Sequence, residues 1–229
     1  MTIELVAFDL GGVLFTDGMK VLVEQLPPGD CEAVRALLKS EPSRELRRGR
    51  IDDATFWSWA ASQLPAHLDP LAIRDAWYAA YTPVPEMFAL AERLRPHVRL
   101  AAFSGNIRSR IEQLDARTPF RHLFDLEVYS FDHGTTKPEP DFVDAFLRLA
   151  GVPPSAILYL DDKESALAPA RARGVHCVLV PHNRQNGRQN GDGFISGVLR
   201  RVGLAVDGEP THAAPASPSA RPTTDRSRE

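Results

Sequence analysis

The sequence predicts an α/β fold in which a parallel sheet forms the core and an all-helical segment is inserted after the first strand. From residue 85 onward, short apolar runs rich in β-branched residues alternate with helical patterns. This alternation is typical of a parallel sheet with helices on both faces. Between residues 16 and 84 the chain instead carries several helical patterns separated by Pro and Gly, without a strand pattern.

Length and composition fit one large globular domain, or one domain with an insertion. The chain has 229 residues, of which 43% are hydrophobic and 25% are charged, as in ordinary soluble proteins. We find no apolar run near the roughly 20 residues of a membrane helix, and the N-terminus lacks the basic start of a signal peptide. The net charge of −3 argues against nucleic acid or an anionic membrane as partner. Cys31 and Cys177 match no metal or redox spacing, which favours reduced thiols in a cytoplasmic protein.

The N-terminal half is expected to contain one strand followed by helices. Residues 3–8 form an apolar run that ends at Asp9 and a Gly-Gly turn, which indicates a buried strand. In the helical segment, capping aspartates mark two helices, expected at about residues 54–64 after Asp53 and at about residues 70–81 after Asp69.

The C-terminal half continues the alternation of strands and helices. Further strands are expected at residues 98–103, 126–131, 157–160 and 175–180, and helices at residues 86–95, 107–114, 140–150, 165–173 and 194–202. The polar, Gly-rich run 182–193 is expected to be a loop, and residues 206–229 a disordered tail without an apolar face. We therefore divide the chain into a Rossmann-like core (1–15 and 85–205), a helical cap (16–84) and a tail (206–229).

Side chains that carry chemistry follow the ends of the predicted strands. Asp9 follows the first strand, Ser104 the second, and Asp161 and Asp162 the fourth, while Lys137 lies in the loop after the third. Ligands of an open parallel sheet bind beyond the carboxyl ends of its strands, so we expect these side chains to converge. Clustered carboxylates suit Mg²⁺, whose coordination is commonly completed by a substrate phosphate. The pattern therefore favours phosphoryl transfer, with Asp9 as nucleophile or metal ligand.

Four segments resemble, in order, the motifs of the haloacid dehalogenase-like hydrolases. They are FDLGGVLF (8–15), AFSGN (102–106), TTKPEPDF (135–142) and ILYLDDKESA (157–166). The resemblance covers roughly residues 3–180, and the helical segment falls where this family carries its C1-type cap. The first motif is similar to the DLG-x-V motif of a subgroup of small-molecule phosphatases.

The resemblance implies a Mg²⁺-dependent phosphatase that hydrolyses a small phosphorylated metabolite, such as a sugar phosphate, through an aspartyl-phosphate. In that reaction Asp9 would attack phosphorus, and Lys137 would hold the nucleophile and the phosphate together. Ser104 and the backbone amides of Gly105 and Asn106 would bind phosphoryl oxygens.

The resemblance also implies a Mg²⁺ site, and the sequence departs from the family pattern at Gly11 and at Ala166, where the fourth motif often has Asn or Asp. Asp161 would bind the ion together with Asp9 and the carbonyl of Gly11, and Asp162 would act through a water molecule. Most phosphatases of the family carry, at the position of Gly11, an Asp that serves as general acid and base. Loss of such a group costs about 10²–10⁴ in rate.

The sequence is also compatible with two other functions. A 2-haloacid dehalogenase uses the same Asp nucleophile without a metal, but its relatives usually carry Tyr where Gly11 stands, and the Asp161-Asp162 pair favours a metal. A ligand-binding protein with little or no catalysis is the other alternative, motivated by Gly11. The cap holds several aromatic residues, each of which is expected to pack within the cap rather than contact substrate: Trp57, Trp59, Trp77, Tyr78 and Tyr81.

Overall fold

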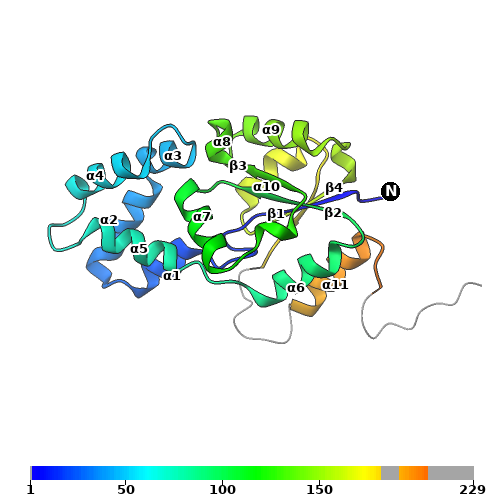
Figure 1. The fold of residues 1–229 in the computed structure, drawn as a ribbon, viewed down its shortest axis with the longest axis horizontal. Coiled ribbons are helices and arrows are strands. Elements are labelled where there is room, and N and C mark those ends of the chain that lie inside the picture. The colour runs from blue at the N-terminus through cyan, green and yellow to red at the C-terminus, as the bar shows by residue number, and fades with distance from the viewer. Residues whose placement is uncertain (1, 182–190, 206–229) are drawn as a thin grey trace, which may run out of the picture.

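A computed structural model of the chain describes residues 2–181 and 191–205. Five parallel strands form one sheet in the order β3-β2-β1-β4-β5 (Figure 1). The strands are β1 (Leu5–Phe8), β2 (Arg99–Ser104), β3 (Leu126–Tyr129), β4 (Ile157–Asp161) and β5 (His176–Leu179). The predicted α/β fold with a parallel sheet is therefore confirmed.

Helices pack on both faces of this sheet, because successive residues of a strand point to opposite sides. Val6 and Phe8 pack with α6 (Pro85–Leu94), α7 (Arg108–Arg117) and α11 (Gly191–Arg201). Leu5 and Ala7 pack with α9 (Pro140–Ala150) and α10 (Glu164–Arg171) on the other face. Figure 1 shows α9 on one side of the sheet and α6 and α11 on the other.

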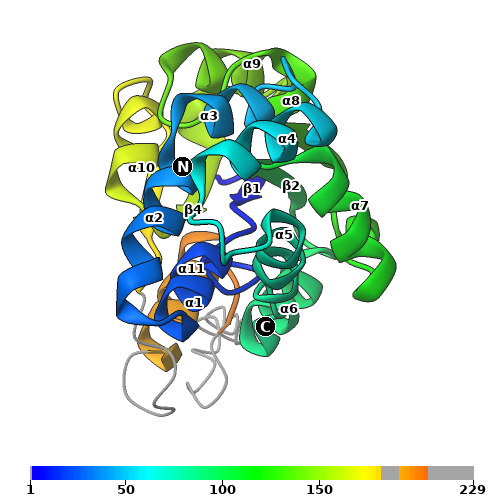
Figure 2. The ribbon, with the colours of Figure 1, turned by 90° about the vertical axis from the view of Figure 1, so that its left-hand side faces the viewer.

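The segment between β1 and α6 carries five helices, here called the helical insertion. They are α1 (Gly18–Gln25), α2 (Pro28–Lys39), α3 (Glu41–Arg47), α4 (Asp53–Gln63) and α5 (Pro70–Ala79). Figure 2, seen from the side of the insertion, shows these helices in front of the strands. The expected strand-free, helical character of this segment agrees with these elements.

Capping side chains set where the helices of the insertion begin. Asp69 caps α5 as expected, since its carboxylate accepts a hydrogen bond from the Leu71 N–H. The expectation that Asp53 caps α4 is wrong. Asp52 is the cap, because its carboxylate accepts from the Thr55 N–H at 2.8 Å, three residues on, as N-cap geometry requires.

The two chain segments that join the insertion to the sheet run side by side; residues 14–16 and 82–84 are called the paired linkers. The Thr16 N–H donates to the carbonyl of Thr82, and the Thr82 N–H donates to the Thr16 hydroxyl, each at 2.9 Å. The Val84 N–H donates to the Leu14 carbonyl, also at 2.9 Å. The insertion therefore leaves and re-enters the core at one point, close to the end of β1.

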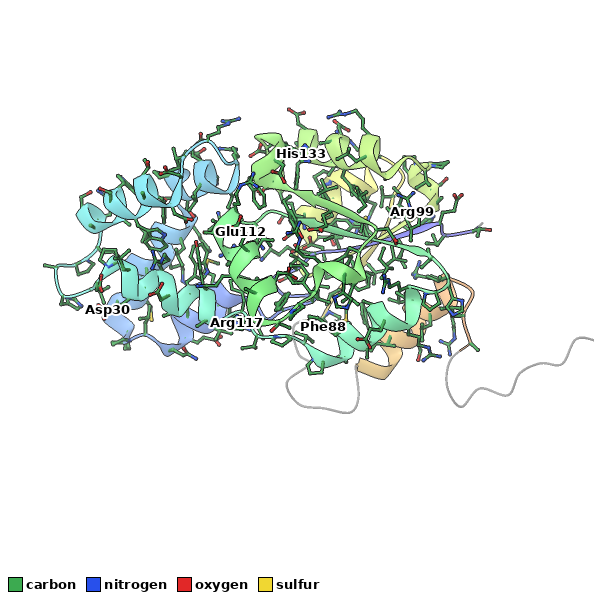
Figure 3. All side chains as sticks on the ribbon, in the orientation of Figure 1. Asp30, Phe88, Arg99, Glu112, Arg117 and His133 are labelled. Atoms are coloured by element: carbon green, nitrogen blue, oxygen red, sulfur yellow. The ribbon has the colours of Figure 1, made fainter. Side chains whose placement is uncertain are left out.

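Arginines also connect the insertion to the core. Arg48, just after α3, donates from Nε to the Glu139 carboxylate at 3.0 Å, directly before α9. Arg117 of α7, labelled in Figure 3, donates to the Tyr81 carbonyl beyond the end of α5. Contacts on both sides thus hold the insertion against the carboxyl end of the sheet.

The remaining differences from the predicted elements are small. The strand expected at 126–131 ends at Tyr129, because Ser130 begins the short helix α8 (Ser130–His133). The expected loop 182–193 lies mostly outside the described residues, and the expected tail 206–229 lies wholly outside them. Within the described part of the chain, no helix is long and apolar enough to cross a membrane.

Candidate active site

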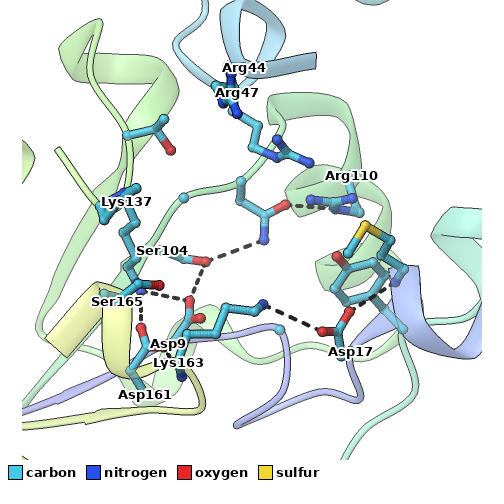
Figure 4. A pocket seen from close by; sticks show the side chains of 18 of the residues that line it. Asp9, Asp17, Arg44, Arg47, Ser104, Arg110, Lys137, Asp161, Lys163 and Ser165 are labelled. Carbon is cyan, nitrogen blue, oxygen red and sulfur yellow. Dashed lines mark hydrogen bonds and ion pairs between the residues drawn. The ribbon is translucent and has the colours of Figure 1, made fainter. Parts of the chain in front are cut away.

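Asp9 lies directly after β1 and is buried between the ends of two neighbouring strands. The parallel register pairs Phe8 with Ala102 and with Leu160, which brings Ser104 and Asp161 beside it. The Asp9 Oδ1 atom accepts hydrogen bonds from the Leu10 N–H and the Ser104 hydroxyl, each at 2.8 Å. The strand ends thus hold this carboxylate in one orientation (Figure 4).

Lys137 links two of the carboxylates. Its Nζ lies 3.0 Å from Asp9 Oδ1 and 2.7 Å from Asp161 Oδ2. Asp161 also accepts hydrogen bonds from the Tyr159 hydroxyl and, at 2.8 Å, from the Lys163 N–H. Burial alone would raise the pKa of Asp161, but Lys137 and these donors outweigh burial and lower it. Asp161 is therefore ionised, both of its oxygens accept hydrogen bonds, and it holds the Lys137 ammonium in place.

Asp9, Asp161 and Asp162 form a compact acidic cluster, with one carboxylate oxygen of each lying within 4.8 Å of the others. Burial, opposed by the charge of Lys137, raises the pKa of Asp9. Burial raises the pKa of Asp162 to about 7, and the charges of Asp9 and Asp161 add to this against Lys163. The excess of negative charge in a buried space is what a divalent cation would relieve.

Gly12 has a structural reason to be glycine. Its φ of +84° lies in the left-handed region, and a Cβ atom there would overlap the carboxylate of Asp162. Gly11, in contrast, has no positive φ, so its backbone accepts other residues. A Cβ on Gly11 would lie 3.0 Å from Cε1 of Tyr81, so the Tyr81 ring crowds any side chain at this position.

The residues expected to bind phosphate lie together but have different partners. Gly105 lines the cavity, and a Cβ on it would lie 2.7 Å from the Thr136 hydroxyl oxygen, which explains the need for glycine. The Asn106 backbone N–H donates to the Ser130 hydroxyl at 3.0 Å. The amide of Asn106 is therefore already engaged, and the Ser104 hydroxyl donates to Asp9, so the Gly105 amide is the one of these three donors that we expect to face a phosphoryl group first.

These side chains line one cavity of about 230 Å³. Its floor is formed by the strand ends, with Asp9, Ser104, Lys137 and Asp161. Its roof is formed by the helical insertion and α7, with the following residues: Met19, Arg44, Arg47, Trp77, Tyr81 and Arg110. Figure 4 shows this arrangement of floor and roof.

Comparison with known proteins identifies the family. Residues 3–174 match the family model of the haloacid dehalogenase-like hydrolases. The chain belongs to this hydrolase family. A protein of Dictyostelium discoideum, itself uncharacterised, is 32% identical over 212 residues, which cover 79% of this chain and 92% of that protein.

Solved structures of similar fold include enzymes with different chemistry. A haloacid dehalogenase-family enzyme of Bacteroides thetaiotaomicron, in complex with magnesium and inorganic phosphate, has a TM-score of 0.69 and 19% identity, over 81% of this chain and 98% of that one. The L-2-haloacid dehalogenase of Xanthobacter autotrophicus, with chloropropionic acid covalently bound, has a TM-score of 0.59 and 22% identity, over 93% of each chain. These similarities show the shared fold, and they leave the substrate of this hydrolase open.

The sequence alone did not identify the residues of the roof. Trp77 and Tyr81 are buried in the insertion, as the sequence predicts, and both also line the cavity. Arg47 and Arg110 stand in none of the four motifs. Arg110 lies one helical turn after Asn106, and this spacing is the signal that could have placed it beside the site.

A lysine-aspartate pair also joins the roof to the floor. Lys163 Nζ lies 3.5 Å from Asp17 Oδ2 and 3.7 Å from Asp162 Oδ2. Asp17 caps α1 by accepting from the N–H groups of Met19 and Lys20. Burial would raise the pKa of Asp17, yet Lys163 and the two amides lower it. Asp17 is therefore an ionised carboxylate rather than a proton donor.

Proposed function

We propose that this hydrolase is a Mg²⁺-dependent phosphatase that acts on a small phosphorylated metabolite, such as a sugar phosphate, through an aspartyl-phosphate. The observation that supports it most is Lys137, whose Nζ lies within 3.0 Å of both Asp9 and Asp161 at the floor of the cavity. A cation in this position favours the ionised form of the Asp9 carboxylate against the effect of burial and balances the charge of a bound phosphoryl group.

Asp9 is the nucleophile in this proposal. Its Oδ1 accepts from Ser104 and is paired with Lys137, so the other oxygen, Oδ2, is assigned to the attack on phosphorus. The new bond joins Oδ2 to phosphorus as the bond from phosphorus to the leaving oxygen breaks. Ser104 and the Gly105 amide orient the phosphoryl oxygens. Water then hydrolyses the aspartyl-phosphate, which releases inorganic phosphate and restores Asp9.

The acidic cluster is suited to hold Mg²⁺. Both oxygens of Asp161 already accept hydrogen bonds, so we assign Asp162, rather than Asp161 as the resemblance implies, as the carboxylate that binds the ion with Asp9 and the Gly11 carbonyl. Asp161 then acts mainly by positioning Lys137. A bound Mg²⁺ would supply neutralisation of the negative charge on the phosphoryl oxygens.

Gly11 restricts the leaving group. A general acid at this position would protonate the departing oxygen, but the ring of Tyr81 crowds any side chain there. Leaving groups of low pKa need the least protonation as the bond to phosphorus breaks. We therefore propose a preference for anomeric sugar phosphates and acyl phosphates over primary alkyl phosphates.

A 2-haloacid dehalogenase is the second candidate, supported by the similarity of fold to the Xanthobacter autotrophicus enzyme. It would use the same Asp9 carboxylate to displace a halide. Against it stand Asp161 and Asp162, which give the site more carboxylates than a metal-independent displacement requires.

One assay separates the two candidates. The protein is treated with EDTA, dialysed and incubated with sugar phosphates, nucleotides and acyl phosphates, with and without Mg²⁺, and inorganic phosphate is measured. In parallel, halide release from 2-chloropropionate is measured without metal. We expect Mg²⁺-dependent phosphate release and no halide release. Halide release alone would replace the phosphatase with the dehalogenase, and a protein that releases neither would contradict both proposals.

A further inference from the structure

Two arginines meet in the roof of the cavity, away from Lys137 and the acidic cluster. Arg47 comes from the end of α3 and Arg110 from α7, and Figure 4 shows their guanidinium groups directed toward the same part of the cavity. Both residues line the cavity together with Asp9 and Ser104. A molecule of suitable length that binds at Asp9 therefore also reaches the arginines.

Arg110 is held rigidly and has hydrogen-bonding capacity to spare. The side chain is buried, with 2% of its surface exposed, and its Nε donates to the Asn106 side-chain oxygen at 2.7 Å. The guanidinium carbon lies 4.3 Å from the ring centroid of Trp77 and 4.4 Å from that of Tyr81. Its Nη1 is buried without a hydrogen-bond partner. A buried, unpaired donor on a charged group is costly unless a ligand satisfies it.

Arg47 adds a second cation without a matching carboxylate. Its Nη2 donates to the Leu38 carbonyl at 3.0 Å, and within the described ranges neither Arg47 nor Arg110 forms an ion pair with an acidic side chain. Burial and the nearby charge of Arg110 lower the pKa of Arg47 to about 10. Two like charges held close together at a cavity wall create a site of positive potential that an anion would stabilise.

The two lysines of the site, unlike the two arginines, are each paired with carboxylates. Lys137 is balanced by Asp9 and Asp161, and Lys163 is balanced by Asp17 and Asp162. Unbalanced positive charge is therefore confined to the arginine end of the cavity. A phosphoryl group at Asp9 does not account for it.

We infer that Arg47 and Arg110 form a subsite for a second anionic group, a carboxylate or a phosphate, carried by the same small molecule whose phosphoryl group reacts at Asp9. The inference rests on the proposed phosphatase function and adds the substrate class to it. The flat guanidinium fork of Arg110, fixed between Trp77 and Tyr81, suits bidentate binding of such a group. The volume of about 230 Å³ is below the usual range for drug-sized ligands, so the substrate is short.

The test uses three matched substrates: propyl phosphate, 3-(phosphonooxy)propanoate and propane-1,3-diyl bisphosphate. All three present a primary alkyl phosphate, so their leaving groups are similar and the second group is the main difference. We expect kcat/KM with Mg²⁺ to be about tenfold to hundredfold higher for at least one of the two substrates with a second anionic group than for propyl phosphate, since hydrogen bonds to charged groups contribute about 1.5–3 kcal/mol. The preferred substrate tells whether the second group is a carboxylate or a phosphate.

Variants then assign that preference to the two arginines. Arg47→Gln and Arg110→Gln are each expected to lower at least tenfold the ratio of kcat/KM between the preferred substrate with a second anionic group and propyl phosphate. Arg110→Lys keeps the positive charge but lacks the paired N–H donors of the guanidinium group. It replaces Arg110→Gln in the test if that variant does not fold. Arg35→Gln is the matched control, because Arg35 is an exposed arginine of α2 outside the cavity. The control should keep the wild-type ratio.

Binding gives a second readout that does not require turnover. Isothermal titration of Asp9→Asn should show tighter binding of the preferred substrate with a second anionic group than of propyl phosphate, and Asp9→Asn/Arg47→Gln should lose the difference. Equal kcat/KM for all three substrates in the wild type, or a ratio unchanged in every arginine variant, would overturn the subsite while leaving the phosphatase in place. Absence of phosphate release from these three esters and from an acyl phosphate such as acetyl phosphate would instead count against the phosphatase, and the titration would still report on the subsite.

Discussion

The floor and the roof of the cavity are built from the same kinds of charged residue but balance them differently. On the floor, Lys137 lies between Asp9 and Asp161, and each of these carboxylates has further hydrogen-bond donors. In the roof, Arg110 is held by aromatic rings and an amide oxygen, and neither it nor Arg47 pairs with a carboxylate in the described part of the chain.

This difference separates two tasks. Groups that take part in bond making must keep one orientation and one protonation state throughout the reaction, and internal partners provide both. Groups that select a substrate contribute most to binding when the substrate supplies the hydrogen-bond or ion-pair partner that the free protein lacks. We therefore expect changes on the floor to reduce turnover of every substrate, and changes in the roof to alter the choice among substrates.

The largest effect is expected for Asp9→Asn on the floor. Removal of the nucleophilic oxygen should lower turnover on the order of 10⁴-fold or more for every substrate, while the melting temperature stays near that of the wild type. Steady-state kinetics and thermal unfolding measure the two properties, and mass spectrometry checks for deamidation back to Asp. Several per cent of the wild-type rate in protein free of deamidation would contradict the assignment of Asp9.

A smaller effect should distinguish the two neighbouring carboxylates. Asp162→Asn is expected to raise the Mg²⁺ concentration for half-maximal activity about 10–100-fold, the range found when groups supporting a metal are altered. Asp161→Asn should mainly lower the maximal rate at saturating Mg²⁺, because it releases Lys137. The measurement is a Mg²⁺ titration of the initial rate for both variants beside the wild type. The reverse outcome would make Asp161 the metal ligand.

Gly11→Asp tests two properties of the point where Gly11 of the floor meets Tyr81 of the roof: how closely they pack, and the effect of a missing general acid. The new Cβ meets Cε1 of Tyr81 at 3.0 Å, so overpacking should reduce the free energy of unfolding by about 1–3 kcal/mol. Wild-type rates over a series of phosphate monoesters should depend steeply on the leaving-group pKa, and the variant should reduce this dependence by helping alkyl phosphates most. A flat wild-type plot would mean that another group donates the proton.

The smallest effect concerns the connection between roof and core at Glu139. Its hydrogen bonds from Arg48 and Thr135 outweigh partial burial and lower its pKa, so the ionised form stabilises the fold. This stabilisation is fully present above the ordinary Glu pKa of about 4.3 and is lost as the pH falls through the lowered value. Glu139→Gln should cost up to about 1 kcal/mol at pH 7.

Thermal unfolding of Glu139→Gln and wild type from pH 7 to pH 3 measures this contribution. The two melting temperatures should converge as the pH falls below about 4. A gap that stays constant over this range would show that ionisation of Glu139 contributes nothing to stability.

The floor could be predicted from the sequence because its position follows from topology. Asp9, Ser104 and Asp161 each stand at the end of an apolar run, and parallel strands bring such ends to one edge. The order of motifs then adds Lys137 from the loop before α9. Topology does not determine local hydrogen bonds. One example is the bond that the Asn106 N–H donates to the Ser130 hydroxyl.

The roof could not be predicted in the same way. A helical pattern indicates which face of a helix is apolar, but the direction of Arg47 depends on how α3 packs against α8 and the rest of the core. Trp77 also illustrates the limit, because it packs in the insertion and lines the cavity at once. Sequence periodicity cannot distinguish an aromatic ring that only packs in the insertion from a ring that also lines the cavity.

The paired linkers have a consequence for how such a protein can diversify. Because Thr16 and Thr82 are hydrogen-bonded to each other, the insertion starts and ends at adjoining points, the arrangement under which proteins tolerate exchange of an inserted unit. A helical segment of different length or sequence could be grafted between Phe15 and Pro83 without changing the alignment of β1 with β2. Exchange of the insertion would replace Arg47 and leave Asp9 and Arg110 in place, so one half of the proposed anion subsite can change independently of the proposed nucleophile.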